Sequence, residues 1–440
     1  MKKHLFLISA LLFSLTAMGQ DITGDWNGVL KVQGVQLRLV FHISRTGEEY
    51  QATMDSPDQM ANGISVTSVS YVPPVLKLSV ANIGMSYEGT WNANGVLAGT
   101  FRQGGVELPL DLSKASPVQP QKLRPQEPHP PYPYYEEEVS FENPEANIRL
   151  AGTLTLPAKT GVYPAVVLIN GSGQQNRNEE IVGHKPFLVL SDYLTRNGIA
   201  VLRYDDRGTA SSTGNFETAT TLDLSYDTEA ALHYLRTRPE IDANHIGLIG
   251  HSEGGVIAPM IAARSPHVSF LVLMAGTGIP GDSLLIEQHS LLGKAYGMSE
   301  ETIEQGQTLL RRAFDAMMQS PDAVQERIAD YPDINTPWVR YFIRHNPAET
   351  LRKVRIPVLA INGEKDLQVP PRTNLPAIRK ALEEGGNRQT SVKELPGLNH
   401  LFQECETGSP AEYESIEQTI SPVALNEILT WIKKQTRGHL

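Results

Sequence analysis

A serine, an aspartate and a histidine are the residues of this sequence whose types and order could perform nucleophilic chemistry together. The segment Gly250–Gly254 reads Gly-His-Ser-Glu-Gly and lies between the apolar run Ile246–Ile249 and a helical pattern that starts at Val256. A serine between a strand and a helix in this pattern sits on a sharp turn, and the glycines let neighbouring backbone pack closely. We therefore predict that Ser252 is a nucleophile; the alternative is a turn serine that caps the following helix.

A serine hydroxyl is a weak nucleophile until a base takes its proton, and the base needs a carboxylate that fixes its orientation. Asp366 and His400 each lie in a loop that follows a predicted strand further along the chain, Pro357–Ile361 and Ser391–Leu395. We predict that Ser252 attacks, His400 transfers the proton and Asp366 orients His400. Glu364 lies on the same predicted loop as Asp366 and is the alternative carboxylate.

The negative oxygen that forms during such an attack needs hydrogen-bond donors. Backbone N–H groups are expected from Glu253, the residue after the nucleophile, and from the loop after the run Ala165–Ile169. That loop reads Asn-Gly-Ser-Gly-Gln, and its small residues can turn their amides inward. We predict Ser172 as the second donor, with Gly173 as its neighbour.

The remaining motifs indicate neither a metal nor a cofactor. None of the twelve histidines stands in a ligand array, and His251 is expected to face away from Ser252. Gly276–Gly281 matches the glycine pattern of dinucleotide-binding turns, but no acidic residue on a second parallel strand follows it. We predict no metal and no cofactor.

Composition and charge exclude several classes of partner. The 440 residues include 38 Lys plus Arg and 49 Asp plus Glu, a net charge of −11 that repels nucleic acid and anionic membrane surfaces. One cysteine, Cys405, cannot form an intramolecular disulfide. The expected partner is therefore a small molecule, and the sequence does not indicate an oligomeric state.

Residues 1–20 have the pattern of a secretory signal peptide: Lys2 and Lys3, an apolar stretch Leu5–Leu15, then small residues. The stretch is shorter than the roughly 20 residues of a membrane-spanning helix, and no later run comes closer. We expect a protein without a membrane span that is exported to the periplasm or secreted.

Residues 21–115 predict a small antiparallel β domain that resembles a barrel. About eight short runs alternate apolar and polar residues between turns, among them Ile64–Val72 as one strand. Asn94 and Gly95 mark a hairpin. Prolines crowd residues 116–134, which favours an extended linker.

Residues 135–440 predict a doubly wound, mainly parallel α/β sheet, because continuous apolar runs alternate with helical ones. Ligands of such sheets bind beyond the carboxyl ends of the strands. A mostly helical insertion at about 277–350 is expected to form a cap over that edge. Trp338, Tyr341 and Phe342 are candidate walls of a substrate pocket; packing of the cap onto the core is the alternative.

Three segments carry a resemblance to a known family: Asn170–Gly173, Tyr204–Gly208 and Gly250–Gly254. With them, the region from about residue 135 onward resembles the α/β-hydrolase superfamily and, within it, bacterial serine carboxylesterases. The resemblance implies ester hydrolysis of EC 3.1.1 type through an acyl-enzyme on the elbow serine, usually with short acyl chains. Gly208–Ser211 departs from the Gly-x-Gly-x-Ser often seen in the family. The β domain and the linker lie outside the resemblance.

Two alternative functions remain at this point. A serine peptidase or amidase uses the same acyl-enzyme chemistry. A protein of another class would bind glycan or lipid through the β domain and carry an inactive hydrolase domain. The presence of Ser252, Asp366 and His400 argues against a degenerate site.

Overall fold

The structure is a computed structural model that describes residues 21–32, 35–47, 49–57, 61–103, 106–114, 124–319 and 334–436. The chain divides into two compact units, Met1–Val118 and Gln119–Leu440. The predicted signal peptide and the first part of the predicted linker lie outside the described residues, so export stays a prediction. No helix in the described part of the chain is long and apolar enough to cross a membrane.

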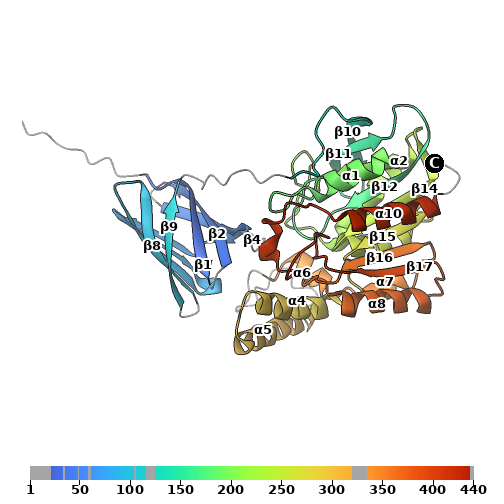
Figure 1. Cartoon of the computed structure of the whole chain (residues 1–440). Helices are drawn as coiled ribbons and strands as arrows, with labels where there is room; N and C mark the ends of the chain where they lie inside the picture. Colours follow the sequence, from blue (N-terminus) through green and yellow to red (C-terminus); the bar gives the residue numbers. More distant parts are fainter. Residues whose placement is uncertain are drawn as a thin grey trace, which may run out of the picture. The chain divides into compact units, whose positions relative to one another are not determined.

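The first unit is one antiparallel nine-stranded sheet in the order β4-β3-β2-β1-β9-β8-β7-β6-β5 (Figure 1). Its elements are β1 (Gly24–Val32), β2 (Val35–Thr46), β3 (Glu49–Ser56), β4 (Ala61–Ser65), β5 (Ser68–Val72), β6 (Val75–Val80), the short 3-10 helix η2 (Ala81–Ile83), β7 (Met85–Trp91), β8 (Val96–Gln103) and β9 (Val106–Ser113). Trp26, Phe41 and Tyr87 are among its fully buried side chains. The predicted small antiparallel barrel-like domain is confirmed.

The predicted single strand Ile64–Val72 is wrong in detail, because the run is divided between β4 and β5. Between them the Val66 N–H donates to Ala52 O of β3, and the Thr67 N–H donates to Ser79 O of β6. One straight strand cannot pair with β3 at one end of the sheet and β6 at the other. The break therefore curls the sheet until its two edges meet.

The second unit contains an eight-stranded sheet in the order β10-β11-β13-β12-β14-β15-β16-β17. Its strands are β10 (Tyr135–Asn143), β11 (Ile148–Leu156), β12 (Tyr163–Ile169), β13 (Ala200–Tyr204), β14 (Ile241–His251), β15 (Phe270–Met274), β16 (Val358–Gly363) and β17 (Thr390–Leu395). β10, β11 and β13 pair antiparallel, and the pairs from β13 to β17 are parallel. The predicted doubly wound, mainly parallel sheet is confirmed.

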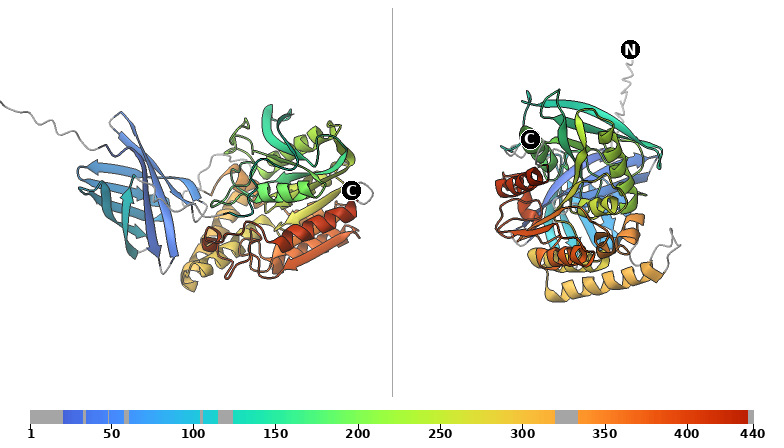
Figure 2. Two further views of the ribbon diagram at one scale, coloured as in Figure 1. Left: turned by 45° about the horizontal axis from the view of Figure 1, so that its top comes forward. Right: turned by 90° about the vertical axis from the view of Figure 1, so that its right-hand side faces the viewer.

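Helices cover both faces of this sheet (Figure 2). One face packs against α1 (Pro186–Arg196) and α10 (Pro422–Gln435). The other packs against α2 (Thr221–Arg236), α3 (Gly254–Ala262) and α8 (Pro371–Glu384). The central strands are buried on both faces, which explains their continuous apolar sequences. A short helix, α9 (Pro410–Tyr413), precedes α10.

The insertion after β15 is helical where the structure describes it. It contains α4 (Gly281–Ala295), α5 (Glu300–Gln319), α6 (Pro337–Phe342) and α7 (Pro347–Leu351). Residues 320–333 of the predicted insertion lie outside the described residues. These helices are the predicted cap.

The described end of the predicted linker is not a free spacer. Arg124 donates to the carbonyl oxygens of Glu414 and Ile416, and Gln126 Oε1 accepts from the backbone N–H groups of Thr419 and Ile420. These contacts satisfy backbone groups of the second unit that have no strand or helix partner. The chain from Arg124 onward is therefore part of the α/β unit.

Candidate active site

Ser252 lies on a tight turn between β14 and α3. Its φ of 51° is in the left-handed region that residues other than glycine seldom adopt, and its N–H donates to Met274 O over 2.8 Å. A Cβ on Gly250 would lie 1.9 Å from Gly254 O, and a Cβ on Gly254 would lie 2.2 Å from Ile169 O. Both glycines are thus required by the close approach of backbone that raises Ser252 on the turn.

Asp366 and His400 contact each other at the carboxyl ends of β16 and β17. His400 Nδ1 is 2.7 Å from Asp366 Oδ2, and both side chains are buried. Two backbone N–H groups of the Asp366 loop hold its other oxygen, each at 2.8 Å. Glu364, the alternative carboxylate, instead accepts from the Gly397 N–H over 2.9 Å. The contact fits the predicted roles, in which His400 Nδ1 donates to Asp366 and Nε2 is the base.

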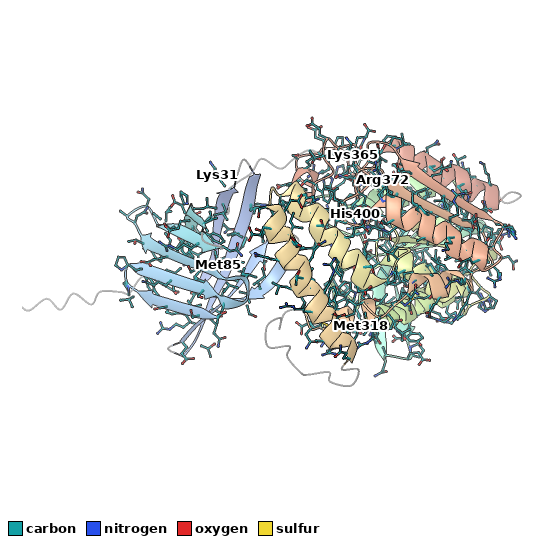
Figure 3. The ribbon with its side chains drawn as sticks, turned by 90° about the horizontal axis from the view of Figure 1, so that it is seen from below. Lys31, Met85, Met318, Lys365, Arg372 and His400 are labelled. Atoms are coloured by element: carbon teal, nitrogen blue, oxygen red, sulfur yellow. The ribbon has the colours of Figure 1, made fainter. Side chains whose placement is uncertain are left out.

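The loops that carry these two residues are packed directly onto each other. Lys365, next to Asp366, donates its N–H to Leu398 O over 2.9 Å. A Cβ on Gly363 would lie 2.3 Å from the same oxygen, so the approach requires glycine there. Figure 3 labels Lys365 and His400 on these two loops. The parallel pairing of β16 with β17 therefore brings an aspartate and a histidine 34 residues apart into contact.

The loop after β12 lies against the serine turn. A Cβ built on Gly171 would be 3.3 Å from Ser252 Cβ, which is close van der Waals contact. Ser172 follows on the exposed side of this loop. Glu253 is the N-cap residue that precedes α3, and its N–H donates to no protein acceptor in the described part of the chain. Ser172 thus follows a glycine that lies against Ser252, and Glu253 lies at the positive end of a helix dipole, while their roles as oxyanion donors stay predictions.

The segment Tyr204–Gly208 contacts the predicted oxyanion loop through Asp206. Asp206 Oδ1 accepts from Asn170 Nδ2, and its Oδ2 accepts from the Gln175 N–H, both over 2.9 Å. Burial raises the pKa of the Asp206 carboxyl well above its usual range, against these hydrogen bonds. The carboxyl therefore fixes both ends of the predicted oxyanion loop.

The departure of Gly208–Ser211 from the family pattern has a visible local effect. Ala210 has a φ of 45°, a conformation that glycine adopts without strain. Arg207, beside this turn, forms a buried ion pair with Asp227 of α2, with Nε 2.6 Å from Oδ2. The turn is thus anchored to α2 even though alanine replaces glycine.

The side chain of Glu253 ties the cap to the serine turn. Its Oε1 accepts from Thr221 Oγ1 over 2.6 Å and from Trp338 Nε1 of α6 over 2.7 Å. Burial raises the pKa of the Glu253 carboxyl, and the hydrogen bonds from Thr221 and Trp338 counter the rise only in part. Its Oε2 is buried and has no hydrogen bond among the described residues. The sequence predicted only a backbone role for Glu253.

The three predicted wall residues belong to one apolar cluster in the described part of the chain, together with Val256 and Leu284. Trp338 and Phe342 stack on each other, with ring centroids 4.9 Å apart, and pack with apolar residues at the start of α3 and α4. Tyr341 also stacks on His345 and lines a groove of about 510 Å³ with Arg344 and with residues of α6 and α7. Of the three, Trp338 alone contacts a residue of the serine turn through a hydrogen bond recorded in the described part of the chain.

His251 connects the serine turn to the histidine loop. Its Nε2 is 3.0 Å from His400 O, and the two imidazole rings lie 4.8 Å apart. Within the described residues no hydrogen bond joins Ser252 Oγ to His400 Nε2. Such bonds are often long before a substrate binds. The roles of Ser252, Asp366 and His400 stay predictions.

Sequence reasoning missed Glu179, which contacts both the predicted oxyanion loop and His251. Nothing in the local pattern distinguishes it from Glu180, because both lie in a loop without periodicity. Its contacts come from residues 8 and 72 positions away. In the described part of the chain, no group of three His, Cys, Asp or Glu side chains is arranged to hold a metal ion.

Comparison with known proteins finds a matching family and relatives that are named as hydrolases. A family described as serine aminopeptidase, S33, matches residues 186–406. Esterase EstD of Thermotoga maritima is 28% identical over 310 residues, which are 69% of this chain and 70% of EstD. Human mitochondrial acyl-coenzyme A thioesterase 2 is 28% identical over 131 residues, 29% of this chain and 24% of that protein. The solved α/β hydrolase GrgF of a Penicillium species covers 68% of this chain and 99% of its own, at 18% identity and a TM-score of 0.45.

Proposed function

The chain belongs to the serine aminopeptidase S33 family of α/β-hydrolases, and we propose that it is a serine hydrolase that cleaves carboxylic esters of short acyl chains. The observation that carries the proposal is the 2.7 Å contact of His400 with Asp366 beside a serine held at a φ of 51°. Similarity to EstD over about two thirds of both chains supports an esterase over the other activities of the fold.

In the proposed reaction Ser252 Oγ attacks the ester carbonyl while His400 Nε2 takes the hydroxyl proton. Asp366 keeps His400 in the tautomer that can accept this proton and stabilises the imidazolium that forms. The backbone N–H groups of Glu253 and Ser172 hold the oxyanion. His400 then gives the proton to the leaving alcohol. The same histidine then takes a proton from a water molecule, whose oxygen attacks the acyl carbon, and gives that proton to Ser252 Oγ as the acid leaves.

Replacing the nucleophile tests this proposal directly. Ser252→Ala is expected to lower kcat for p-nitrophenyl acetate by about 10⁴-fold or more, with unchanged thermal unfolding. Ser172→Ala is the matched control: it removes a hydroxyl but keeps the backbone N–H, so activity should stay within a few-fold. A Ser252→Ala protein that retains most of its turnover would end the assignment.

An acyl-length series tests the substrate class. We expect kcat/KM for p-nitrophenyl esters to fall from acetate and butyrate toward octanoate. A maximum of kcat/KM at the longest acyl chain would contradict the proposed preference for short acyl chains. It would not contradict the proposal that Ser252 is the nucleophile.

A peptidase or amidase is the second candidate, because the matched family is described as serine aminopeptidase. Amide cleavage passes through the same acyl-enzyme. Release of p-nitroaniline from aminoacyl anilides at rates that rival ester hydrolysis would favour this candidate.

A binding protein with an inactive hydrolase domain is the candidate of another class. A fluorophosphonate probe separates it from both enzymes, since only an activated serine reacts. We expect stoichiometric labelling of the wild-type protein at Ser252.

A further inference from the structure

The buried carboxylate of Glu179 joins two parts of the site. Its Oε1 accepts from the Gly171 N–H over 2.7 Å and lies 2.9 Å from His251 Nδ1. Glu179 itself has a φ of 52°, a strained conformation for a residue with a Cβ. The bend turns an otherwise surface loop inward, so that Glu179 is buried while the next residue, Glu180, is exposed.

Hydrogen-bond chemistry decides where the protons of this pair lie. His251 Nε2 faces the carbonyl oxygen of His400, which can only accept, so Nε2 carries a proton. His251 Nδ1 faces Glu179 Oε1, which already accepts from the Gly171 N–H. All three hydrogen bonds are satisfied when His251 is a doubly protonated imidazolium and Glu179 is ionised.

The charged groups around His251 favour this state. Burial lowers its pKa, but the Glu179 carboxylate, the hydrogen bond to His400 O and the more distant Asp366 together raise it above the ordinary value. The His400 ring lies 4.8 Å away and is a further titratable group that faces His251. Both nitrogens of His251 are engaged, so it has no free nitrogen with which to act as the base.

We propose that Glu179 and His251 form a charged positioning pair that holds the oxyanion loop and the histidine loop in place on either side of Ser252. The pair connects Gly171, which precedes the predicted donor Ser172, to the backbone of His400. It touches neither substrate nor reacting atoms and acts through the groups that do. The inference rests on the proposed serine hydrolase function.

Glu179→Gln tests the pair, because the amide keeps the size of the side chain and removes its charge. One Gln oxygen can still accept from the Gly171 N–H, but His251 then lacks a counter-charge. We expect kcat for p-nitrophenyl acetate to fall about 10- to 100-fold, as a small misplacement of reacting groups does, with little change in KM. The neighbouring exposed Glu180→Gln is the matched control and should behave as wild type.

The pH profile separates positioning from a loss of stability. Glu179 raises the pKa of His251. The charged positioning pair is therefore complete at low pH and is lost as the pH rises through the pKa of His251. Without the carboxylate this pKa falls, so the alkaline limb of kcat/KM should move to lower pH in Glu179→Gln. If Glu179 only stabilised the fold, Glu179→Gln would lower kcat/KM equally at every pH, and the pH of the alkaline limb would not change.

His251→Gln is the second variant, in case Glu179→Gln does not fold. Glutamine can donate to His400 O and does not titrate, so activity should be reduced without an alkaline limb. A wild-type alkaline limb that persists unchanged in either folded variant overturns the inference. Labelling by a fluorophosphonate keeps the two proposals apart: a wild-type protein that is not labelled refutes the serine hydrolase, whereas labelled proteins with identical rates refute only the positioning pair.

Discussion

At the scale of single residues, the surroundings give three buried carboxyl groups near Ser252 different tasks. Asp366 accepts from two backbone N–H groups and contacts His400 Nδ1. Glu253 is held by Thr221 and Trp338, and burial raises its pKa. Glu179 is paired with a histidine instead. The residue type alone would not separate these roles.

The residue-scale prediction concerns Asp366. In Asp366→Asn the amide can present an N–H to His400 Nδ1, which favours the tautomer that cannot accept the serine proton. We expect kcat to fall about 10³- to 10⁴-fold for p-nitrophenyl acetate, with unchanged thermal unfolding. Glu364→Gln, on the same loop, should keep nearly full activity. A larger loss of kcat in Glu364→Gln than in Asp366→Asn would make Glu364 the carboxylate that orients His400.

At the scale of elements, the site is made by the carboxyl ends of four parallel strands. β12, β14, β16 and β17 lie within one sheet and end at the same edge. β12 leads into the predicted oxyanion loop, β14 into the serine turn, and β16 and β17 into the Asp366 and His400 loops. To the serine turn the cap adds a hydrogen bond from Trp338 of α6 to Glu253.

The element-scale prediction concerns the crossing of β12 with α3. A methyl group at Gly254 would meet backbone oxygens at 2.2 and 2.9 Å, and backbone cannot move aside as a flexible side chain can. We expect Gly254→Ala to lower the free energy of unfolding by about 1–3 kcal/mol and to slow fluorophosphonate labelling. In Gly276→Ala the nearest atom is 3.2 Å away, so the loss should be smaller. Equal losses in urea unfolding would contradict the steric argument.

At the scale of the whole molecule, each unit has a core of its own. The first unit buries Trp26, Phe41 and their neighbours inside a curled sheet. The second buries separate apolar clusters on the two faces of its sheet. All residues of the proposed site belong to the second unit. Compact units with separate cores usually fold alone.

The prediction at this scale is that removal of residues 1–118 leaves an active enzyme. Because Arg124 and Gln126 are part of the α/β unit, the shortened chain should begin before them. We expect kcat/KM for p-nitrophenyl acetate to stay within about threefold of the full chain, as for an independent domain. Loss of folding or of this activity in the shortened protein would show that the β unit supports the site.

The sequence by itself determined the fold class, the identity of the serine turn and the order of the candidate residues along the chain. These features are local: continuous apolar runs indicate strands buried on both faces, and glycines around Ser252 indicate a turn that tolerates no Cβ. The cap helices α4, α5 and α6 followed from helical periodicity in the same way. Each can be predicted because neighbouring residues alone produce the pattern.

The tertiary structure decided which side chains meet. It joined His400 to Asp366 and directed Glu364 to the Gly397 N–H. It also brought Glu179 to His251 and divided one apolar run between β4 and β5. These contacts link loops that follow different strands, and their geometry depends on strand order, register and backbone bends rather than on local periodicity. A loop carboxylate acquires its partner only when the sheet has brought distant loops to one edge.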